Sequence, residues 1–311
     1  MPSPGPKPIS GKRTSAPAPQ QTVSGRWLLK AIGAIILAAL VCSYLSLCLL
    51  YRQGQWQIVL HPDPAAKTKP APQGLIHFGP DESGRPQLTG EWLSAAPGGR
   101  YAAITVLFLG GGDGSRLNAQ ATVTALHELE LNVLWFDYRG YGLSENIHPS
   151  QQRMTEDSES AWRYLTRTRE VAPRQIVLYG TGVGASLATW LATEHSEVPA
   201  IILDTPYADL FEVARTDSRS GLLPAGIFFH ERFPLTAPLA TLTTPKLLIS
   251  PNKEAEPSAF VTAATPKLTA SLPSPAGPLF NQTVTRFLDQ YVVASTPQLV
   301  PSVAPVGTKP R

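Results

Sequence analysis

The sequence predicts an α/β protein with a mostly parallel sheet, helices on both faces of the sheet, and one transmembrane helix near the N-terminus. Three observations support this prediction. Short apolar runs that suit strands buried on both faces alternate with stretches of helical period. Residues 31–50 contain no charged residue and are long enough to cross a bilayer as a helix. A glycine-rich turn at 180–184 joins one apolar run to a helical stretch.

The composition divides the chain into parts of different character. We expect a disordered Pro/Ser-rich basic tail, a transmembrane helix, a linker with an edge strand, the α/β domain, and a disordered Pro-rich tail. These parts are, in order, residues 1–25, 26–51, 52–84, 85–293 and 294–311.

The apolar stretch is read as a retained membrane anchor. The alternative is a cleaved signal peptide, which has a shorter apolar region followed by a small-x-small site. No such site follows cleanly, and neither Cys42 nor Cys48 follows a convincing small residue for lipoprotein processing. Five Lys or Arg residues precede the apolar core and three follow within about twenty residues. We therefore expect a cytoplasmic N-terminus and a C-terminal domain on the non-cytoplasmic side.

Charge and cysteine content exclude several classes of function. The net charge is +3, with much of the positive charge in the tails, so nucleic-acid binding is not expected. The two cysteines both lie in the apolar run, so the globular part has no disulfide. The histidines show no metal-ligand spacing, and no cofactor is expected.

The elements are expected in an alternating order that is typical of βαβ units. Expected strands are residues 55–60, 87–93, 103–109, 132–138, 176–179, 200–204, 246–249 and 267–272. Expected helices are residues 117–131, 155–168, 184–195 and 279–293. Residues 61–86 look loop-like, with a turn at 79–86, and Asp157 and Glu159 are placed in the first turn of their helix. In such a sheet, ligands bind beyond the carboxyl ends of the strands.

Four stretches carry a resemblance to a known family. They are LWFDYRGYGLS at 134–144, DSESAWRYL at 157–165, LYGTGVGA at 178–185 and IILDTP at 201–206. Together with the preceding anchor, these stretches resemble the α/β-hydrolase superfamily, and more narrowly membrane-anchored serine hydrolases with a serine-aminopeptidase-like domain. The resemblance covers about residues 85–293 and implies an α/β-hydrolase fold. It also implies hydrolysis of esters, thioesters or amides by a Ser–Asp/Glu–His triad in that chain order.

The triad positions implied by the resemblance are not filled as the chemistry requires. The G-x-S-x-G pattern reads GTGVG, so Gly182 stands where the nucleophile should be. Glu254 lies near the acid position, although it also fits an ordinary charged loop residue. The histidine is expected within residues 271–279, and no histidine occurs after His230. Loss at separate positions indicates degeneration of the triad.

Backbone groups of an oxyanion hole do not depend on side chains and are the part of the site expected to persist. The resemblance places these groups at Val183 and at Gly111 or Gly112; the alternative is a bare tight turn. Our leading hypothesis is a catalytically degenerate protein that binds a small acyl ligand or a protein partner. The alternative is an active esterase, thioesterase or peptidase with a displaced nucleophile and base. In a third hypothesis, the domain only separates the anchor from a partner-binding C-terminal tail.

Overall fold

The computed structural model describes residues 24–62, 74–114, 119–207, 210, 229–252 and 256–293. The chain falls into two compact units, Met1–Leu50 and Tyr51–Arg311. The expected tails lie almost wholly outside the described residues and stay predictions.

Helix α1 (Gly25–Gly54) is the long apolar helix that the sequence predicts. Its 30 residues rise about 45 Å, which exceeds the hydrocarbon core of about 30 Å. Its most apolar window has a mean hydropathy of 2.4, and 6% of that window is buried. Among the described residues it is the one helix with these properties, and it is compatible with a membrane anchor or a signal sequence.

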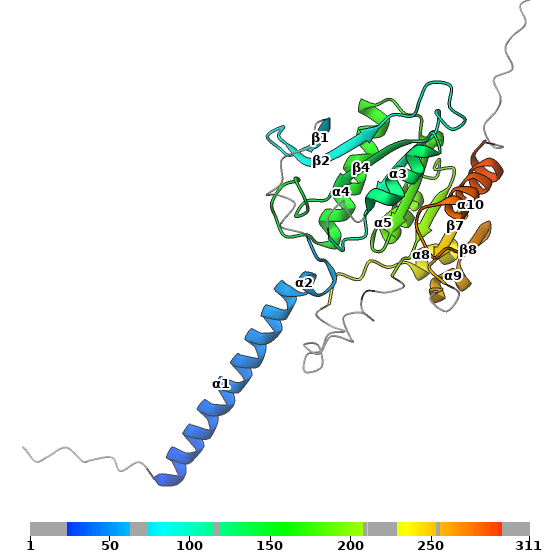
Figure 1. Ribbon diagram of the computed structural model, residues 1–311. Coiled ribbons are helices and arrows are strands. Elements are labelled where there is room, and N and C mark those ends of the chain that lie inside the picture. Colours follow the sequence, from blue (N-terminus) through cyan, green and yellow to red (C-terminus); the bar gives the residue numbers. More distant parts are fainter. Residues whose placement is uncertain are drawn as a thin grey trace, which may run out of the picture. The chain divides into compact units, whose positions relative to one another are not determined.

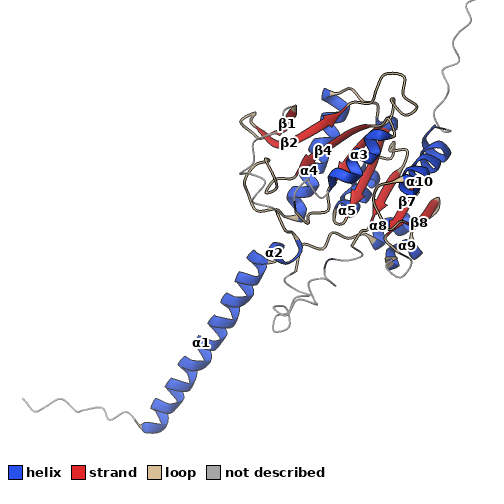
Figure 2. Ribbon diagram, viewed as in Figure 1, coloured by secondary structure: helices blue, strands red, loops and turns tan. Residues whose placement is uncertain are grey.

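The second unit contains one eight-stranded sheet in the order β1-β2-β4-β3-β5-β6-β7-β8 (Figures 1 and 2). The strands are β1 (Leu75–Pro80), β2 (Pro86–Leu93), β3 (Thr105–Leu109), β4 (Asn132–Asp137), β5 (Ile176–Thr181), β6 (Ile201–Asp204), β7 (Lys246–Ser250) and β8 (Lys267–Ser271). Strand β2 pairs antiparallel with β1 and β4, and every other pair is parallel. The predicted fold class, a mostly parallel sheet, is confirmed.

Helices cover both faces of the sheet because the central strands are apolar on both sides. One buried cluster contains Met154 and Leu187, and the other contains Leu126 and Phe287. These residues belong to helices on opposite faces, α4 and α5 against one face and α3 and α10 against the other. The helical elements of the domain are α2 (Trp56–Val59), α3 (Gln120–Glu128), α4 (Gln151–Arg163), η3 (Tyr164–Thr168), η4 (Pro173–Gln175), α5 (Gly184–Glu194), α8 (Thr236–Thr241), α9 (Ser258–Thr262), α10 (Pro278–Leu288) and η6 (Asp289–Val293).

Two predictions near the start of the domain are wrong. Residues 55–60 form the helical turn α2 instead of a strand, closed by a hydrogen bond from the Leu60 N–H to the Trp56 carbonyl. The stretch expected to be loop contains β1, in which Phe78 is the one buried side chain. The predicted turn at 79–86 joins β1 to β2 in a hairpin, where Asp81 accepts hydrogen bonds from two backbone N–H groups. A strand with so little buried surface gives a weak periodic signal.

Candidate functional site

The predicted elbow is present between β5 and α5, and its apex is Gly182. The backbone of Gly182 has φ +53°, which glycine adopts without the strain that a side chain brings. A Cβ atom here would lie 3.0 Å from both the Cα and the carbonyl oxygen of Gly111. Gly184 begins the helix so close to β3 that a Cβ would meet the Leu109 carbonyl oxygen at 2.1 Å. A side chain at the apex would therefore fit only with a small shift of the glycine loop.

The structure brings together the three residues that the sequence predicted for an oxyanion hole. Gly111 and Gly112 follow β3 and lie against Val183. The Val183 N–H donates to the Gly111 carbonyl oxygen, with an N···O distance of 3.4 Å. The Gly112 carbonyl oxygen accepts the His61 N–H and the Tyr141 hydroxyl, each at 2.9 Å. The Val183 donor thus faces a carbonyl of its own chain, so this arrangement does not present an open oxyanion hole.

The remaining triad positions offer no base in the described part of the chain. Glu254 lies outside the described residues. All six histidines are described, and none of them lines the cavity beside the elbow. His195, for example, contacts Glu159 at 2.9 Å and stacks on Trp162. Among the described residues no group of His, Cys, Asp and Glu could hold a metal ion.

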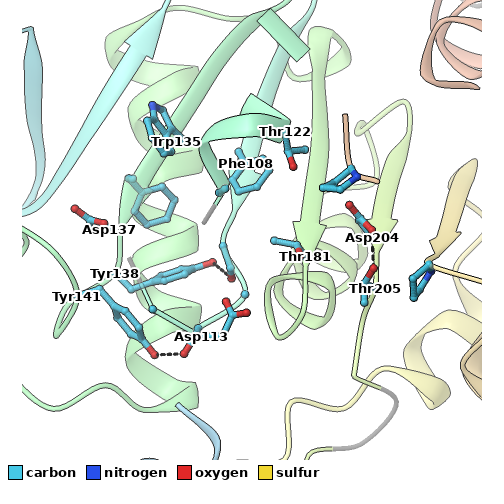
Figure 3. Close-up of a pocket in the computed structure, with 18 of the residues that line it drawn as sticks. Phe108, Asp113, Thr122, Trp135, Asp137, Tyr138, Tyr141, Thr181, Asp204 and Thr205 are labelled. Carbon is cyan, nitrogen blue, oxygen red and sulfur yellow. Dashed lines mark hydrogen bonds between the residues drawn. The ribbon is translucent and has the colours of Figure 1, made fainter. Parts of the chain in front are cut away.

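A cavity of about 200 Å³ lies at the carboxyl ends of the central strands (Figure 3). The glycine loop 110–114 forms one wall, with aromatic side chains beside it and prolines from the β7 and β8 ends. The polar side chains of Asp113, Thr181, Asp204 and Thr205 also line it. Thr181, the residue before the elbow apex, thus belongs to the cavity lining.

The Asp204 carboxylate at the end of β6 is a buried, hydrogen-bonded polar group of the cavity. It is 6% exposed. Its Oδ2 accepts the Tyr179 hydroxyl at 2.7 Å, and its Oδ1 accepts the Thr205 hydroxyl at 2.8 Å (Figure 3). Burial raises the pKa of Asp204 above its ordinary value, partly offset by these two hydrogen bonds. Thr205 has φ +46°, an outlier for a β-branched residue.

Asp204 and Thr205 lie in the stretch IILDTP at 201–206, but no sequence pattern marks Thr205 as a functional residue. Tyr179 lies 25 residues before its Asp204 partner, and the two meet only because β5 and β6 are neighbours in the sheet. The one sequence signal for a polar group here was the carboxylate at the end of a buried strand.

Arg139, in the stretch at 134–144, makes contacts that are structural. Its backbone N–H donates to Asp157 Oδ2 at 2.8 Å, and its guanidinium pairs with Asp157 and Glu156. This network ties the end of β4 to α4. The helix begins at Gln151 and is capped by Ser150, so the prediction that Asp157 lies in the first turn is wrong.

The segment that follows α1 belongs to the surroundings of the site. Gln55 is buried, and its Oε1 accepts the His230 N–H at 2.7 Å. Leu60 is 1% exposed, and its side chain lies 3.1 Å from the position of a Cβ on Gly112. Residues 55–61 therefore pack on the outer side of the glycine loop.

The sheet order, the strand–elbow–helix and the cavity at the strand ends define an α/β-hydrolase-fold protein whose elbow lacks a nucleophilic side chain. The chain belongs to the serine aminopeptidase (S33) family, whose model matches residues 99–256.

The curated relatives of this chain include an uncharacterized protein and an alpha/beta hydrolase domain-containing protein. The uncharacterized protein Rv2307c of Mycobacterium tuberculosis is 29% identical over 226 residues, which cover 71% of this chain and 78% of the relative. The alpha/beta hydrolase domain-containing protein 17C of Xenopus tropicalis is 30% identical over 171 residues. That match covers 51% of this chain and 48% of the relative, so the chain spans about half of the 17C protein.

Solved structures share the fold at lower identity. The Pyrococcus furiosus esterase Pf2001 superposes with a TM-score of 0.55 at 19% identity, covering 75% of this chain and 96% of the esterase. An α/β hydrolase from Vibrio vulnificus gives a TM-score of 0.52 at 19% identity, covering 91% and 98%. These likenesses support the fold alone.

Proposed function

We propose that this protein is a membrane-anchored member of the family that has lost serine-hydrolase turnover and acts by binding a ligand in the cavity beside the elbow. One observation carries the proposal. The elbow apex is Gly182, which supplies no nucleophile and whose surroundings leave little room for a side chain beside Gly111. Nucleophilic catalysis needs an attacking oxygen or sulfur and a base to activate it.

The remaining chemistry of the cavity favours binding over turnover. No histidine lines it, and the Val183 N–H is directed at the Gly111 carbonyl. Loss of a complete triad lowers kcat by a factor on the order of 10⁶. The cavity still combines apolar walls with a few polar groups, which is the usual make-up of a small-molecule site. We take a small acyl compound as the ligand class that the family relationship favours.

The anchor in this proposal is α1, retained in the membrane. The excess of Lys and Arg on its N-terminal side places the N-terminus in the cytoplasm and the domain on the other side. A cysteine-accessibility experiment on intact cells, with single cysteines placed on either side of α1, tests this orientation. Labelling of a domain cysteine by a membrane-impermeant reagent without permeabilisation is the expected result, and its protection would contradict the orientation.

Steady-state hydrolysis tests the loss of turnover. The full chain, purified in detergent, is incubated with p-nitrophenyl acetate and followed well beyond one product per protein, beside an active serine hydrolase as control. We expect the steady-state rate of nitrophenolate release to equal the rate without protein. We also expect no fluorophosphonate labelling at the elbow. Sustained turnover above background, abolished by a substitution in the cavity, would support the alternative of an active esterase with a displaced nucleophile.

A further inference from the structure

The cavity contains a hydroxyl group and a carboxylate in the arrangement that activates a nucleophile. Thr205 Oγ donates to Asp204 Oδ1 at 2.8 Å, and Tyr179 holds the other carboxylate oxygen at 2.7 Å. A nucleophile within 2.6–3.2 Å of a base, with the base oriented by a third group, is the general signature of covalent catalysis. Both Asp204 and Thr205 line the cavity.

The backbone at Thr205 supports a role for this residue beyond strand termination. Thr205 directly follows β6 and holds φ +46°, a left-handed conformation that is strained for a β-branched residue. Its N–H donates to the Ile249 carbonyl oxygen at 2.9 Å, which fixes the strained turn. Thr205 is nevertheless an exposed residue that lines the cavity, while Asp204 stays buried. Strained residues of this kind cluster at functional sites.

The location of the pair fits attack on an acyl ligand in the cavity. Asp204 is the ladder partner of Thr181, the last residue of β5, so the pair lies one strand away from the vacant elbow. Thr181, which carries a hydroxyl group, lines the same cavity. Burial raises the pKa of Asp204 toward the range in which a carboxylate accepts a proton more readily.

We propose that Thr205 is an acyl-accepting nucleophile, with Asp204 as its base and Tyr179 as the residue that positions the base. This inference rests on the proposed function, because it assumes that the cavity binds the acyl compound. The substrate class is an activated acyl compound, such as a thioester or a phenyl ester. The product is an acyl ester on Thr205, which keeps the ligand in place.

The step is balanced without a co-reactant. The Thr205 oxygen attacks the acyl carbon, and its proton passes to Asp204 Oδ1 as the new C–O bond forms. The tetrahedral intermediate collapses by breaking the bond to the leaving thiolate or phenolate. Asp204 then gives its proton to the leaving group or to solvent and returns to the carboxylate.

The experiment measures single-turnover acylation of the full chain in detergent, with p-nitrophenyl acetate as the probe. Released nitrophenolate is followed by stopped flow, and peptide mass spectrometry locates the acetyl group. We expect one equivalent of product, with the acetyl group on Thr205. Thr205→Val keeps the shape of the side chain and should abolish this burst, whereas Thr205→Ser should keep it.

Further variants separate chemistry from structure. Asp204→Asn keeps an oxygen that can accept from Tyr179 but removes the base, and should slow acylation by about 100-fold or more. Thr168→Val, at an exposed threonine that does not line the cavity, is the matched control and should acylate like the parent protein. Melting temperatures of all variants show whether a loss of acylation follows from unfolding.

The outcomes distinguish this inference from the proposed function. Absence of a burst, or an acetyl group that is unchanged in Thr205→Val, would overturn the role of Thr205 while leaving ligand binding intact. A burst followed by sustained turnover, both lost in Thr205→Val, would support the nucleophile and overturn the proposed loss of turnover. A single burst at Thr205 supports both.

Discussion

Restoring a serine at the elbow should not restore a hydrolase. The change is Gly182→Ser, which returns the family's G-x-S-x-G pattern to the chain. The new hydroxyl has no histidine in the cavity to accept its proton. We therefore expect neither fluorophosphonate labelling of the new serine nor turnover of p-nitrophenyl acetate above that of the parent protein.

The same substitution should destabilise the domain. A side chain at φ +53° costs about 1–2 kcal/mol relative to glycine. The added Cβ would lie 3.0 Å from two backbone atoms of Gly111, which have to move. Taken together, we expect a loss of about 1–3 kcal/mol in the free energy of unfolding. For a domain of this size that corresponds to a melting temperature lower by about 3–10 °C.

Thermal unfolding and active-site labelling of the purified full chain check both parts. Gly182→Ala is the matched control, because it adds the same Cβ without a hydroxyl and should lower the melting temperature equally. Stoichiometric labelling of the new serine would refute the claim that the base is missing. An unchanged melting temperature in both variants would refute the claim that Gly111 lies too close to the apex for a side chain to fit without a shift.

Three further substitutions test ion pairing and packing within the domain. Arg139→Leu leaves the buried Asp157 without its partner and should lower the free energy of unfolding by about 3–5 kcal/mol in chemical denaturation. Part of this loss should be recovered when Asp157 is also replaced by Leu. If the effects of the two substitutions simply add in the double variant, the pairing is contradicted. Burial and the nearby Lys267 lower the pKa of Lys246 from 10.5 to about 8, so the unfolded chain binds more protons between these values. Stability should therefore rise with pH across that window, and Lys246→Met should flatten the rise; identical slopes for the two proteins would show that another group is responsible. Leu60→Ala should cost about 2–5 kcal/mol in thermal unfolding, because this side chain is 1% exposed in the core; a loss below about 1 kcal/mol would mean that α2 is not part of the cooperative fold.

Much of the sheet could be predicted because its central strands are continuous apolar runs between clear turns. The elbow glycines and the strand ends that surround the cavity could also be predicted from the sequence. The stretch that became α2 was misread because a short apolar segment suits a strand or a helical turn equally. Strand β1 was missed because most of its side chains are only partly buried.

The chemistry of the cavity depended on geometry that a sequence does not display. No propensity predicts that a threonine adopts φ +46°, so the placement of Thr205 beside the cavity could not be predicted from the sequence. The resemblance placed an oxyanion hole at Val183 and at Gly111 or Gly112, since all three carry backbone donors. Only the spatial arrangement shows the Gly111 carbonyl turned toward the Val183 N–H.

The contacts of residues 55–61 have a consequence for any release of the domain from its anchor. A protease that cuts at or before residue 54 leaves Gln55 and Leu60 in place, with their bonds to the domain intact. A cut after Leu60 removes that core side chain and with it one of the side chains that lie against Gly112. Shedding is thus compatible with an intact domain only within a few residues of the apolar helix. Tension from α1 would load the hydrogen bond between Gln55 and the His230 N–H first, and would reach the glycine loop only through Leu60 and His61.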